Sequence, residues 1–360
     1  MIHSLPILDR YIGRSVLLST LMVMVVLLIL FTFFAFMDEL KSASIGRGSY
    51  DTLAAVQYVL LGIPGQAYQL FPVSALLGAM IGLGGLASNS ELVVMRAAGV
   101  SLLRIMGSVM KIGLLFVLAT IIIGETLAPA AERYAQTFRS VSISDKLTLR
   151  GKHGLWARDG ESFINVREIL PGDRLGDIHI YARDRNFRLT HILRAQSAFY
   201  RNGQWVLRQV TQSDIGESAV NSQRQGELVW DTRLSPDLLN VVTVKPSTLS
   251  VWGLLQYVRY LRDNGLDASI YEQAFWSKVA APLVTAVMVF LAMPFVFGPL
   301  RSVGIGHRIM AGTLVGVGFH IINQMFGYVG LVFNLGPMLM AFVPVTVALI
   351  VGYLMLRRVF

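Results

Sequence analysis

The chain has 360 residues, of which 54% are hydrophobic and only 15% charged, and its mean hydropathy is +0.58. This composition excludes a single soluble domain of ordinary make-up and indicates a membrane protein. The chain has no Cys, which excludes disulfides and thiolate chemistry. Its net charge of +9 comes from scattered residues, without the basic blocks of a nucleic-acid-binding protein, so binding to anionic lipid fits better.

The first part of the chain predicts three membrane spans. Residues 15–37 form an uncharged run that is too long for a signal peptide, so we expect a retained first span. A second apolar run at about residues 56–87 exceeds the ~20 residues needed to cross a bilayer. This run contains two prolines and is expected to tilt, kink or begin with a lip outside the membrane. A third span is expected at about residues 112–128, with Lys111 at its inner end and Glu125 near its outer end.

A short half-polar segment, ASNSELVVMRAAGV at residues 87–100, separates the second and third runs. Ser88 can cap a helix here, Glu91 can close a capping box and Gly99 can end it, which predicts a helix at about residues 88–98 outside the membrane. About ten residues at 1.5 Å each give a rod of roughly 15 Å. A hairpin needs only a few residues, so this rod suggests a docking element. An interfacial elbow, in which Glu91 serves only its own cap, stays open.

The middle of the chain has a different character. Residues 132–267 hold all but twelve of the 31 Lys and Arg and all but seven of the 22 Asp and Glu. Short alternating runs at residues 162–169 and 178–184 predict β-strands, and an Asn-Gly pair at residues 202–203 favours a tight hairpin turn. Strands spaced by turn residues predict a β-sandwich or a jelly roll outside the membrane.

An amphipathic helix is expected at residues 250–264, where apolar side chains share one face and Gly265 follows. Three further apolar runs come after it, at about residues 275–297, 309–333 and 335–356. The chain is therefore expected to be an α+β membrane protein with six transmembrane helices in a 3+3 plan. The expected domains are a first transmembrane half (1–131), a central β domain (132–268) and a second transmembrane half (269–360).

Short loops decide the orientation of a multi-span chain, because Lys and Arg gather in the short cytoplasmic loops. Most basic residues of the short loops fall on one side: Arg10, Arg14, Arg96, Arg104, Lys111, Arg301, Arg308, Arg357 and Arg358. Lys41 and Arg47 fall on the other side. We therefore expect both termini and the helix at residues 88–98 in the cytoplasm. The β domain is expected outside, since long domains are exempt from the charge rule.

Motifs of intrinsic catalysis are missing from the sequence. It contains no G-x-x-x-x-G-K-[ST] loop to cradle ATP phosphates and no G-x-S-x-G nucleophile elbow. The six His form no H-E-x-x-H or comparable cluster, and without Cys a metal site has little to build on. No catalytic residue and no metal ligand is predicted. Isolated Ser, Asp and His in the outer domain are expected to be surface residues.

Small and polar residues in two spans suggest close helix contacts or a pathway. Gly78 and Gly82 form a small-xxx-small pair, continued by Gly85, for which plain packing within the chain is the simpler account. One face of the fifth span carries Gly316, His320, Asn323, Gln324 and Gly327. Such a face should meet protein or a cavity, because polar groups are expensive against lipid tails. Hydrogen bonding between helices and the lining of a pathway both stay open.

Three sequence motifs on this plan carry a resemblance to a known family: LDRYIGR at residues 8–14, LASNSELVVMRAAGVS at 86–101 and FGPLRSVGIGHRI at 297–309. Across the whole chain they resemble the LptF/LptG family of lipopolysaccharide-export permeases, and the LptG branch more than the LptF branch. The resemblance implies a multi-pass protein of the bacterial inner membrane with a periplasmic jellyroll. It implies that lipopolysaccharide is drawn from the outer leaflet into a cavity and passed by the jellyroll to a periplasmic bridge.

The same resemblance implies partners. The chain would form a heterodimer with an LptF-like paralogue, be driven by a dimer of the LptB-like ATPase, and hand lipopolysaccharide to an LptC-like single-span jellyroll protein. ATP and Mg would be bound by the ATPase, so the chain itself would carry no cofactor. The ATPase-coupling residues would be Ser90, Glu91, Met95 and Arg96. Glu91 matches a family glutamate that sits in the ATPase groove.

Lipopolysaccharide contacts are expected from Lys41, Arg47, Phe71, Arg301 and His320. Basic side chains near the membrane faces can pair with lipid phosphates, although snorkelling or topology explains each of them as well. By resemblance, Lys41 corresponds to a phosphate-binding residue at the outer end of the first span, and Arg301 to a family arginine implicated in function. His320 lies where relatives place a large cavity-facing residue. The chain departs from the family at a deeper basic position, which falls in LFTFFAF, and at a second lysine, replaced by Ser42.

Two other classes of protein stay open. One is a permease of another ATP-driven lipid or lipoprotein exporter, although those usually place the large outer domain after the first of four spans. The other is a membrane sensor whose β domain binds a ligand and whose cytoplasmic rod signals. A sensor should work without an ATPase partner, so co-purification separates these classes. An open edge of the outer sheet would suit strand addition to a neighbouring jelly roll.

Overall fold

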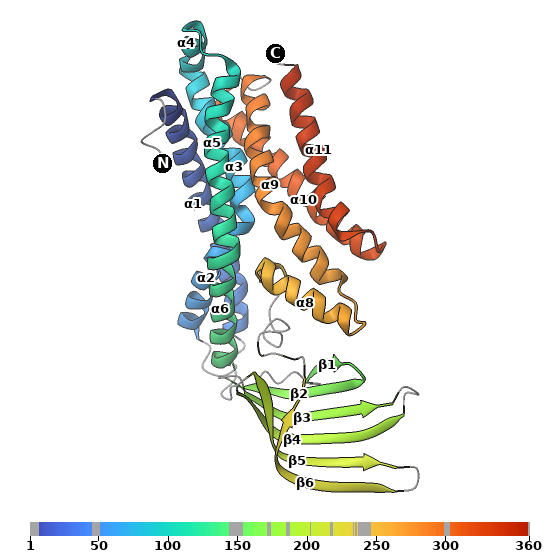
Figure 1. Cartoon of the computed structure of the whole chain (residues 1–360). Coiled ribbons are helices and arrows are strands. Elements are labelled where there is room, and N and C mark those ends of the chain that lie inside the picture. The colour runs from blue at the N-terminus through green and yellow to red at the C-terminus, as the bar shows by residue number, and fades with distance from the viewer. Residues whose placement is uncertain are drawn as a thin grey trace.

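In the computed structural model of the chain, the described residues are 7–44, 51–143, 154–170, 174–184, 188–201, 203–216, 219–232, 234, 236, 246–298 and 303–358. Arg47 and Arg301, two expected lipid contacts, and Asn202 of the expected turn lie outside these residues. Six of the described helices are long and apolar enough to cross a membrane. They lie three before and three after a β-sheet, which confirms the predicted 3+3 plan (Figure 1).

The first half of the chain is helical. Its elements are α1 (Ile7–Ser44), α2 (Thr52–Leu61), α3 (Ile63–Ser88), α4 (Glu91–Ala97), α5 (Leu102–Ile122), the π-helical segment η2 (Ile123–Leu127) and α6 (Ala128–Ile143). The long second apolar run is two helices, α2 and α3, that meet at Gly62. Pro64 lies in the first turn of α3, where a missing N–H leaves no helical bond unmade. The ten residues of α2 are too few to cross a bilayer, in keeping with the predicted lip.

The third span is longer than the sequence predicted. The elements α5, η2 and α6 follow one another without a break, whereas the apolar run covers only residues 112–128. Charged residues end a membrane span, but they do not end a helix, so the polar continuations stay helical on both sides. The expected domain boundary between residues 131 and 132 consequently falls inside α6, and the sheet begins only at Leu155.

Glycine lets α1 and α3 pack at close range. A Cβ at Gly78 would lie 2.6 Å from the backbone nitrogen of Thr20, and one at Gly82 would lie 2.9 Å from the carbonyl oxygen of Ser15. The Ser15 hydroxyl also donates to the Gly82 carbonyl at 3.1 Å. Gly85 meets no atom within 4 Å. The small-residue pair is therefore a packing device within this chain, which was the simpler of the two interpretations.

The β domain is one antiparallel sheet whose strand order follows the chain. Its described strands are β1 (Leu155–Asp159), β2 (Ser162–Leu170), β3 (Arg174–Arg183), β4 (Leu189–Arg201), β5 (Gln204–Ile215) and β6 (Val220–Trp230). The predicted hairpin joins β4 to β5, where Arg201 pairs with Gln204 and Gly203 has a φ of 83°, a left-handed value that favours glycine. The sheet is curved in Figure 1, and the domain is jellyroll-like.

The amphipathic helix predicted after the strands is α8 (Val251–Asp263), followed by α9 (Ser269–Phe297), α10 (Ile305–Val332) and α11 (Pro337–Arg357). Ser250 caps α8 by accepting from the Gly253 amide, and Gly265 ends it with a φ of 63°. Leu254 and Leu261 of α8 are buried in one apolar core with the inner face of the sheet. α8 thus belongs to the core of the β domain and joins that domain to the bundle.

The two ends of the bundle carry different elements. Figure 1 shows the start of α1, the short helix α4 and the end of α11 at one end of the molecule. The helices α2, α6 and α8 and the sheet lie at the opposite end. The chain ends and α4 therefore lie at one end of the bundle and the sheet at the other.

Two Arg side chains and one His side chain surround Asp177 on β3. Its carboxylate contacts His179 at 3.0 Å, Arg194 at 3.2 Å and Arg167 at 3.3 Å. Burial alone raises the pKa of Asp177, but the hydrogen bond and charge of His179 and the two Arg charges outweigh it. The pKa of Asp177 therefore lies below its usual value.

Replacing Asp177 with Asn should lower the thermal stability of the sheet at pH 7 more than at pH 3. A carboxyl with a lowered folded pKa stabilises the fold above its unfolded pKa of about 3.9, and this contribution disappears as the pH falls through the folded pKa. Thermal unfolding of the full chain in detergent, followed by Trp fluorescence, measures the difference. Asp214→Asn is the control, since Asp214 is exposed and bonds to the neutral Gln212 side chain. An equal loss at both pH values would contradict the ion-pair argument.

Candidate functional site

The helix predicted at about residues 88–98 exists, but it is shorter than expected and starts differently. α4 has seven residues, which at 1.5 Å each make a rod of about 10 Å. Its start at Ser90 is in the left-handed region, with a φ of 61° and no side-chain cap. The predicted Ser88 cap is wrong, because α3 continues to Ser88 and that hydroxyl donates to the Gly85 carbonyl at 2.9 Å. Gly99, with a φ of 86°, lies just after the helix, as predicted.

Glu91 does not close a capping box with Ser88. One oxygen of its carboxylate accepts a hydrogen bond from the Tyr11 hydroxyl at 2.7 Å, and the other accepts from the Asn89 amide at 3.4 Å. Tyr11 belongs to the first turns of α1, 80 residues earlier in the chain. Glu91 therefore ties the short helix to α1 and keeps its carboxylate in a fixed place.

The first turns of α1 are themselves fixed to α5. The buried Asp9 carboxylate accepts from the Ser108 hydroxyl and from the Lys111 ammonium, both at 2.6 Å. Both Asp9 and Tyr11 lie in the LDRYIGR motif at residues 8–14. This motif thus connects α1 to α4 and α5 at the same end of the bundle.

The outer surface of α4 combines an apolar patch with charge. Leu92 is buried and anchors the helix to the bundle, and Met95 packs partly against the same core. Val94 is 65% exposed, and Ser90 and Arg96 are also exposed. The exposed Val94 lies on the same short helix as the Glu91 carboxylate. Such a combination of apolar surface and charge suits contact with a protein partner better than contact with solvent.

The expected lipid contacts do not form one cluster among the described residues. Lys41 sits on α1 near the sheet end of the bundle and pairs with Asp38 at 2.8 Å, with both side chains more than three-quarters exposed. Such an exposed pair contributes little stability. Phe71 is only 8% exposed and packs edge-to-face on Phe116 inside the bundle. A side chain so placed offers almost no surface to a lipid, because its α3 face turns toward α5.

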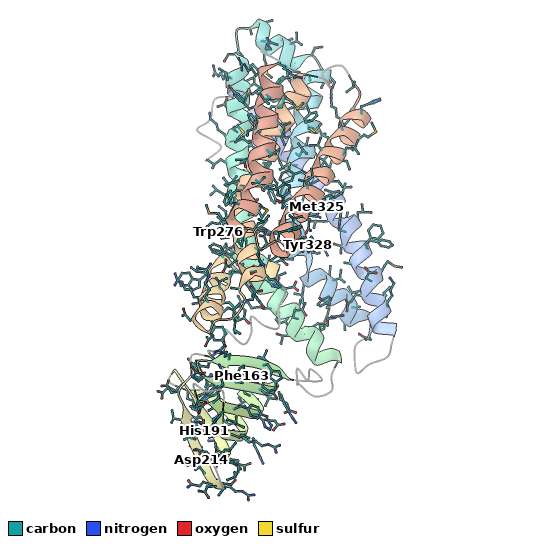
Figure 2. All side chains as sticks on the ribbon, turned by 90° about the vertical axis from the view of Figure 1, so that its right-hand side faces the viewer. Phe163, His191, Asp214, Trp276, Met325 and Tyr328 are labelled. Atoms are coloured by element: carbon teal, nitrogen blue, oxygen red, sulfur yellow. The ribbon has the colours of Figure 1, made fainter. Side chains whose placement is uncertain are left out.

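The helix α10 leaves most of its membrane-length surface uncovered. Its core-facing side packs through Gly312 and Gly316 on α3, while His320 is exposed and lies 3.5 Å from Gln324. Figure 2 labels Met325 and Tyr328 in the half of α10 nearer the sheet, where they are 57% and 66% exposed. In the bilayer this surface must meet lipid tails or a second protein.

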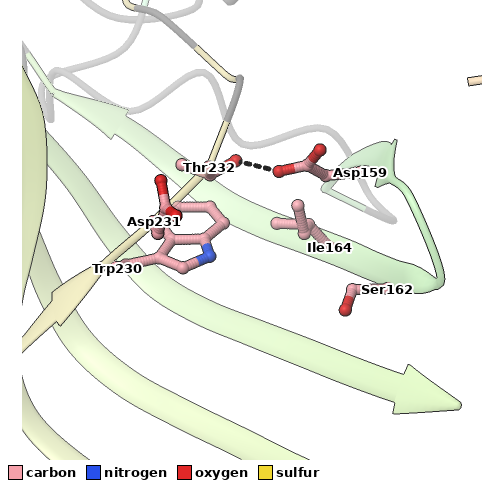
Figure 3. A pocket seen from close by; sticks show the side chains of 6 residues that line it. All are labelled: Asp159, Ser162, Ile164, Trp230, Asp231 and Thr232. Atoms are coloured by element: carbon pink, nitrogen blue, oxygen red, sulfur yellow. Dashed lines mark hydrogen bonds between the residues drawn. The ribbon is translucent and has the colours of Figure 1, made fainter. Parts of the chain in front are cut away.

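A polar pocket lies at the edge of the sheet (Figure 3), lined by Asp159, Ser162, Ile164, Trp230, Asp231 and Thr232. The Thr232 hydroxyl donates to the Asp159 carboxylate at 2.6 Å across it. No group of three His, Cys, Asp or Glu that could hold a metal ion occurs within the described parts of the chain. The pocket offers hydrogen bonds but no nucleophile-and-base arrangement.

Sequence reasoning missed two residues of this site and its surroundings. Tyr11 was quoted only as part of a motif, because its partner Glu91 is 80 residues away. Lys278 lies in α9 within an apolar run and is 7% exposed. The signal for Lys278 was present, since an ionisable residue inside a predicted span is a functional candidate by default.

Six helices long and apolar enough to cross a membrane, an inserted antiparallel sheet and a short exposed helix between the second and third spans define a multi-pass membrane protein. Comparison with known proteins narrows this class. The family described as lipopolysaccharide export system permease LptF/LptG matches residues 10–358. The chain is 39% identical over 355 residues to the lipopolysaccharide export system permease protein LptG of Escherichia coli (strain K12), covering 98% of each chain. It is 38% identical over 353 residues to the protein of the same name from Haemophilus influenzae, again covering 98% of each.

The chain therefore belongs to the LptF/LptG family of lipopolysaccharide export system permeases. It is a multi-pass inner-membrane protein and a transporter subunit, and it is not a catalytic enzyme by itself. The family assignment made from the three sequence motifs is confirmed.

Proposed function

We propose that the chain is the LptG-type permease of an ATP-driven lipopolysaccharide exporter and that α4 is the place where an LptB-like ATPase docks. The observation that carries this proposal is the Glu91 carboxylate, held at the α4 end of the bundle by Tyr11 at 2.7 Å beside the exposed Val94 and Arg96. A fixed carboxylate suits a groove with positive charge or hydrogen-bond donors. Because the sequence has no ATP-binding loop, ATP and Mg belong to the partner.

The lipid path in this proposal runs along α10 and the outer end of α1. An LptF-like permease faces the uncovered side of α10, and lipopolysaccharide enters between the two subunits. Lys41 supplies a phosphate contact, His320 faces the cavity, and Arg47 and Arg301 are proposed contacts that lie outside the described residues. β1 and β6 are the edge strands of the described sheet, and an LptC-like jellyroll protein could add a strand at such an edge.

The proposed orientation places both termini and α4 in the cytoplasm and the sheet in the periplasm. Its support is the gathering of basic residues at the α4 end of the bundle, including the exposed Arg10, Arg14 and Arg96. The buried Arg308 donates to the Gly84 carbonyl at the same end. In this orientation the ATPase binds on the cytoplasmic side, where ATP is present. The sheet lies in the periplasm, where the bridge to the outer membrane begins.

Native purification in detergent from a Gram-negative host tests the proposed function. We expect a second six-span permease and a small cytoplasmic ATPase to co-purify with the chain. The complex in proteoliposomes should then release lipopolysaccharide to a soluble jellyroll acceptor only when ATP is present. A chain that purifies alone, or with a kinase-like partner, would instead support a membrane sensor. A complex that moves lipoproteins and not lipopolysaccharide would support another exporter.

A further inference from the structure

A buried ion pair joins the bundle to the β domain. The Lys278 side chain on α9 is 5% exposed, and its ammonium lies 3.6 Å from the Glu125 carboxylate of η2. The same ammonium donates to the Leu249 carbonyl and lies over the ring of Tyr68, 5.6 Å from its centre. Glu125 is 32% exposed, so the buried member of the pair is the Lys278 ammonium, and burying such a charge is expensive unless it has specific partners.

The Glu125 carboxylate completes the junction. Its second oxygen accepts a hydrogen bond from the Val251 amide at 2.9 Å. Leu249 and Val251 flank the capping residue Ser250, so the pair grips the backbone on both sides of the point where α8 begins. Lys278 and Glu125 thus both bond to main-chain groups. The positions of these groups are set by the backbone and not by a side-chain rotamer.

The π-helical turn presents Glu125 at this point. Such turns are rare, and they often occur at functional sites because the extra residue redirects side chains. Gly124 lies against the Tyr68 ring, where a Cβ would come 2.5 Å from a ring carbon. The turn is therefore packed tightly on α3, and it points Glu125 toward α8.

From α8 the contacts continue into the sheet. The Tyr260 hydroxyl of α8 donates to the Arg158 carbonyl of β1 at 2.7 Å, and the Asn264 amide oxygen accepts from the Gly160 amide at 2.9 Å. Asn264 is buried, and Tyr260 belongs to the apolar core shared with the sheet. α8 and the sheet therefore move as one body, while the ion pair fixes the start of α8 to the bundle.

We propose that Glu125 and Lys278 are positioning residues that fix α8 to the transmembrane bundle, so that movement of the bundle during transport moves the β domain with it. This inference rests on the proposed transport function. Other contacts also join α8 to α9: Tyr257 packs on Tyr271, and Arg262 pairs with Glu272 at 2.8 Å. Lys278 and Glu125 differ from these contacts because they bond two backbone groups, the Leu249 carbonyl and the Val251 amide. They therefore fix the position of the start of α8.

The experiment uses Lys278→Met in the full complex with its permease and ATPase partners. Met keeps the length of the side chain but cannot donate to the Leu249 carbonyl. The chain has no Cys, so spin labels at Tyr134→Cys on α6 and Gln256→Cys on α8, both exposed, are unique within this chain, and Cys-free partner chains complete the complex. Electron-paramagnetic-resonance distances between them are measured without nucleotide and after trapping with ATP and vanadate. Arg194→Met is the matched control, because that Arg pairs with Asp177 at 3.2 Å on the neighbouring strand β3.

In the wild type and in Arg194→Met we expect one narrow distance distribution that is the same before and after trapping, because η2 fixes the start of α8 and continues directly into α6. In Lys278→Met we expect a distribution at least twice as broad. ATP-dependent transfer of lipopolysaccharide should fall at least tenfold, while ATP hydrolysis changes by less than threefold. A Lys278→Met complex with wild-type distances and transfer overturns the inference. So does a wild-type distance that changes on trapping, because α8 would then move relative to the bundle.

The experiment also distinguishes failed assembly of the variant from failed transfer by the wild type. If Lys278→Met does not assemble, Glu125→Gln replaces it, because Gln keeps an acceptor for the Val251 amide but has no charge for Lys278. The expected transfer is then about threefold below wild type, and unchanged transfer and distances overturn the inference. If the wild-type complex transfers no lipopolysaccharide, the proposed function fails, and the distance measurements alone still decide whether the pair positions α8.

Discussion

Changing Glu91 to Lys should release the ATPase from the purified complex and lower its ATP hydrolysis by about 30-fold or more. The substitution removes the carboxylate held by Tyr11 and places a cation in the groove that received it. Truncating one partner of a buried charge pair at an interface costs about 2–5 kcal/mol, and each 1.4 kcal/mol is tenfold in affinity. Co-purification of the three proteins and ATPase activity at fixed concentration measure the effect. The chain itself should remain inserted in the membrane.

Two companion variants separate docking from local structure. Tyr11→Phe keeps the ring but removes the donor, so we expect a smaller loss of ATPase binding than with Glu91→Lys. Glu91→Ala should also lower coupling, because the partner loses its anion. If Glu91→Ala left ATPase binding unchanged, Glu91 would merely bond Tyr11 and Asn89, and α4 would be an interfacial elbow.

The second large effect is expected from Gly78→Val. A Cβ at this position would overlap the backbone of Thr20 on α1, and backbone cannot move aside as a side-chain tip can. Overpacking typically costs about 1–3 kcal/mol, and a clash with backbone belongs at or above the upper end. We expect α1 and α3 to separate, and the yield of monodisperse protein in detergent to fall severely. Size-exclusion profiles and thermal unfolding of the purified chain measure the loss.

Gly85→Val is the matched control for that experiment, since a Cβ at Gly85 meets nothing within 4 Å. It lies on the same helix, seven residues later, and carries the same change in volume and helix propensity. We expect near-normal yield for this variant. Equal damage from both substitutions would show that the helix α3, and not its contact with α1, is sensitive to the added side chain.

Much of the fold follows from hydrophobic patterns in the sequence. The uncharged and weakly charged runs located all six spans, because a bilayer requires about 20 apolar residues in succession. Alternation predicted the strands, and the glycine after Asn202 predicted the β4–β5 turn. Such signals are local: each depends on residues within one element. The ends of helices are less well marked, which is why the rod of α5, η2 and α6 was underestimated.

The site could be predicted only in part, because its decisive contacts join distant residues. Glu91 was identified, but its partner was assigned to Ser88 by spacing, and the structure gives Tyr11 instead. Phe71 looked available in a helix of uncertain orientation, yet it faces α5. The junction at Lys278 required knowing that η2 and the start of α8 meet α9.

The continuous rod of α5, η2 and α6 contains 21, 5 and 16 residues and begins just after α4. At 1.5 Å per residue it is about 63 Å long, twice the ~30 Å hydrocarbon thickness of a bilayer. A rod of that length is a lever: a tilt of ~10° at its α4 end sweeps the far end through roughly 11 Å. A small change in tilt beside α4 would therefore move the end of α6 by about a nanometre. Bending at the π-helical turn η2 would reduce this displacement. The stiffness of η2 therefore determines how far the end of α6 moves for a given tilt of α5.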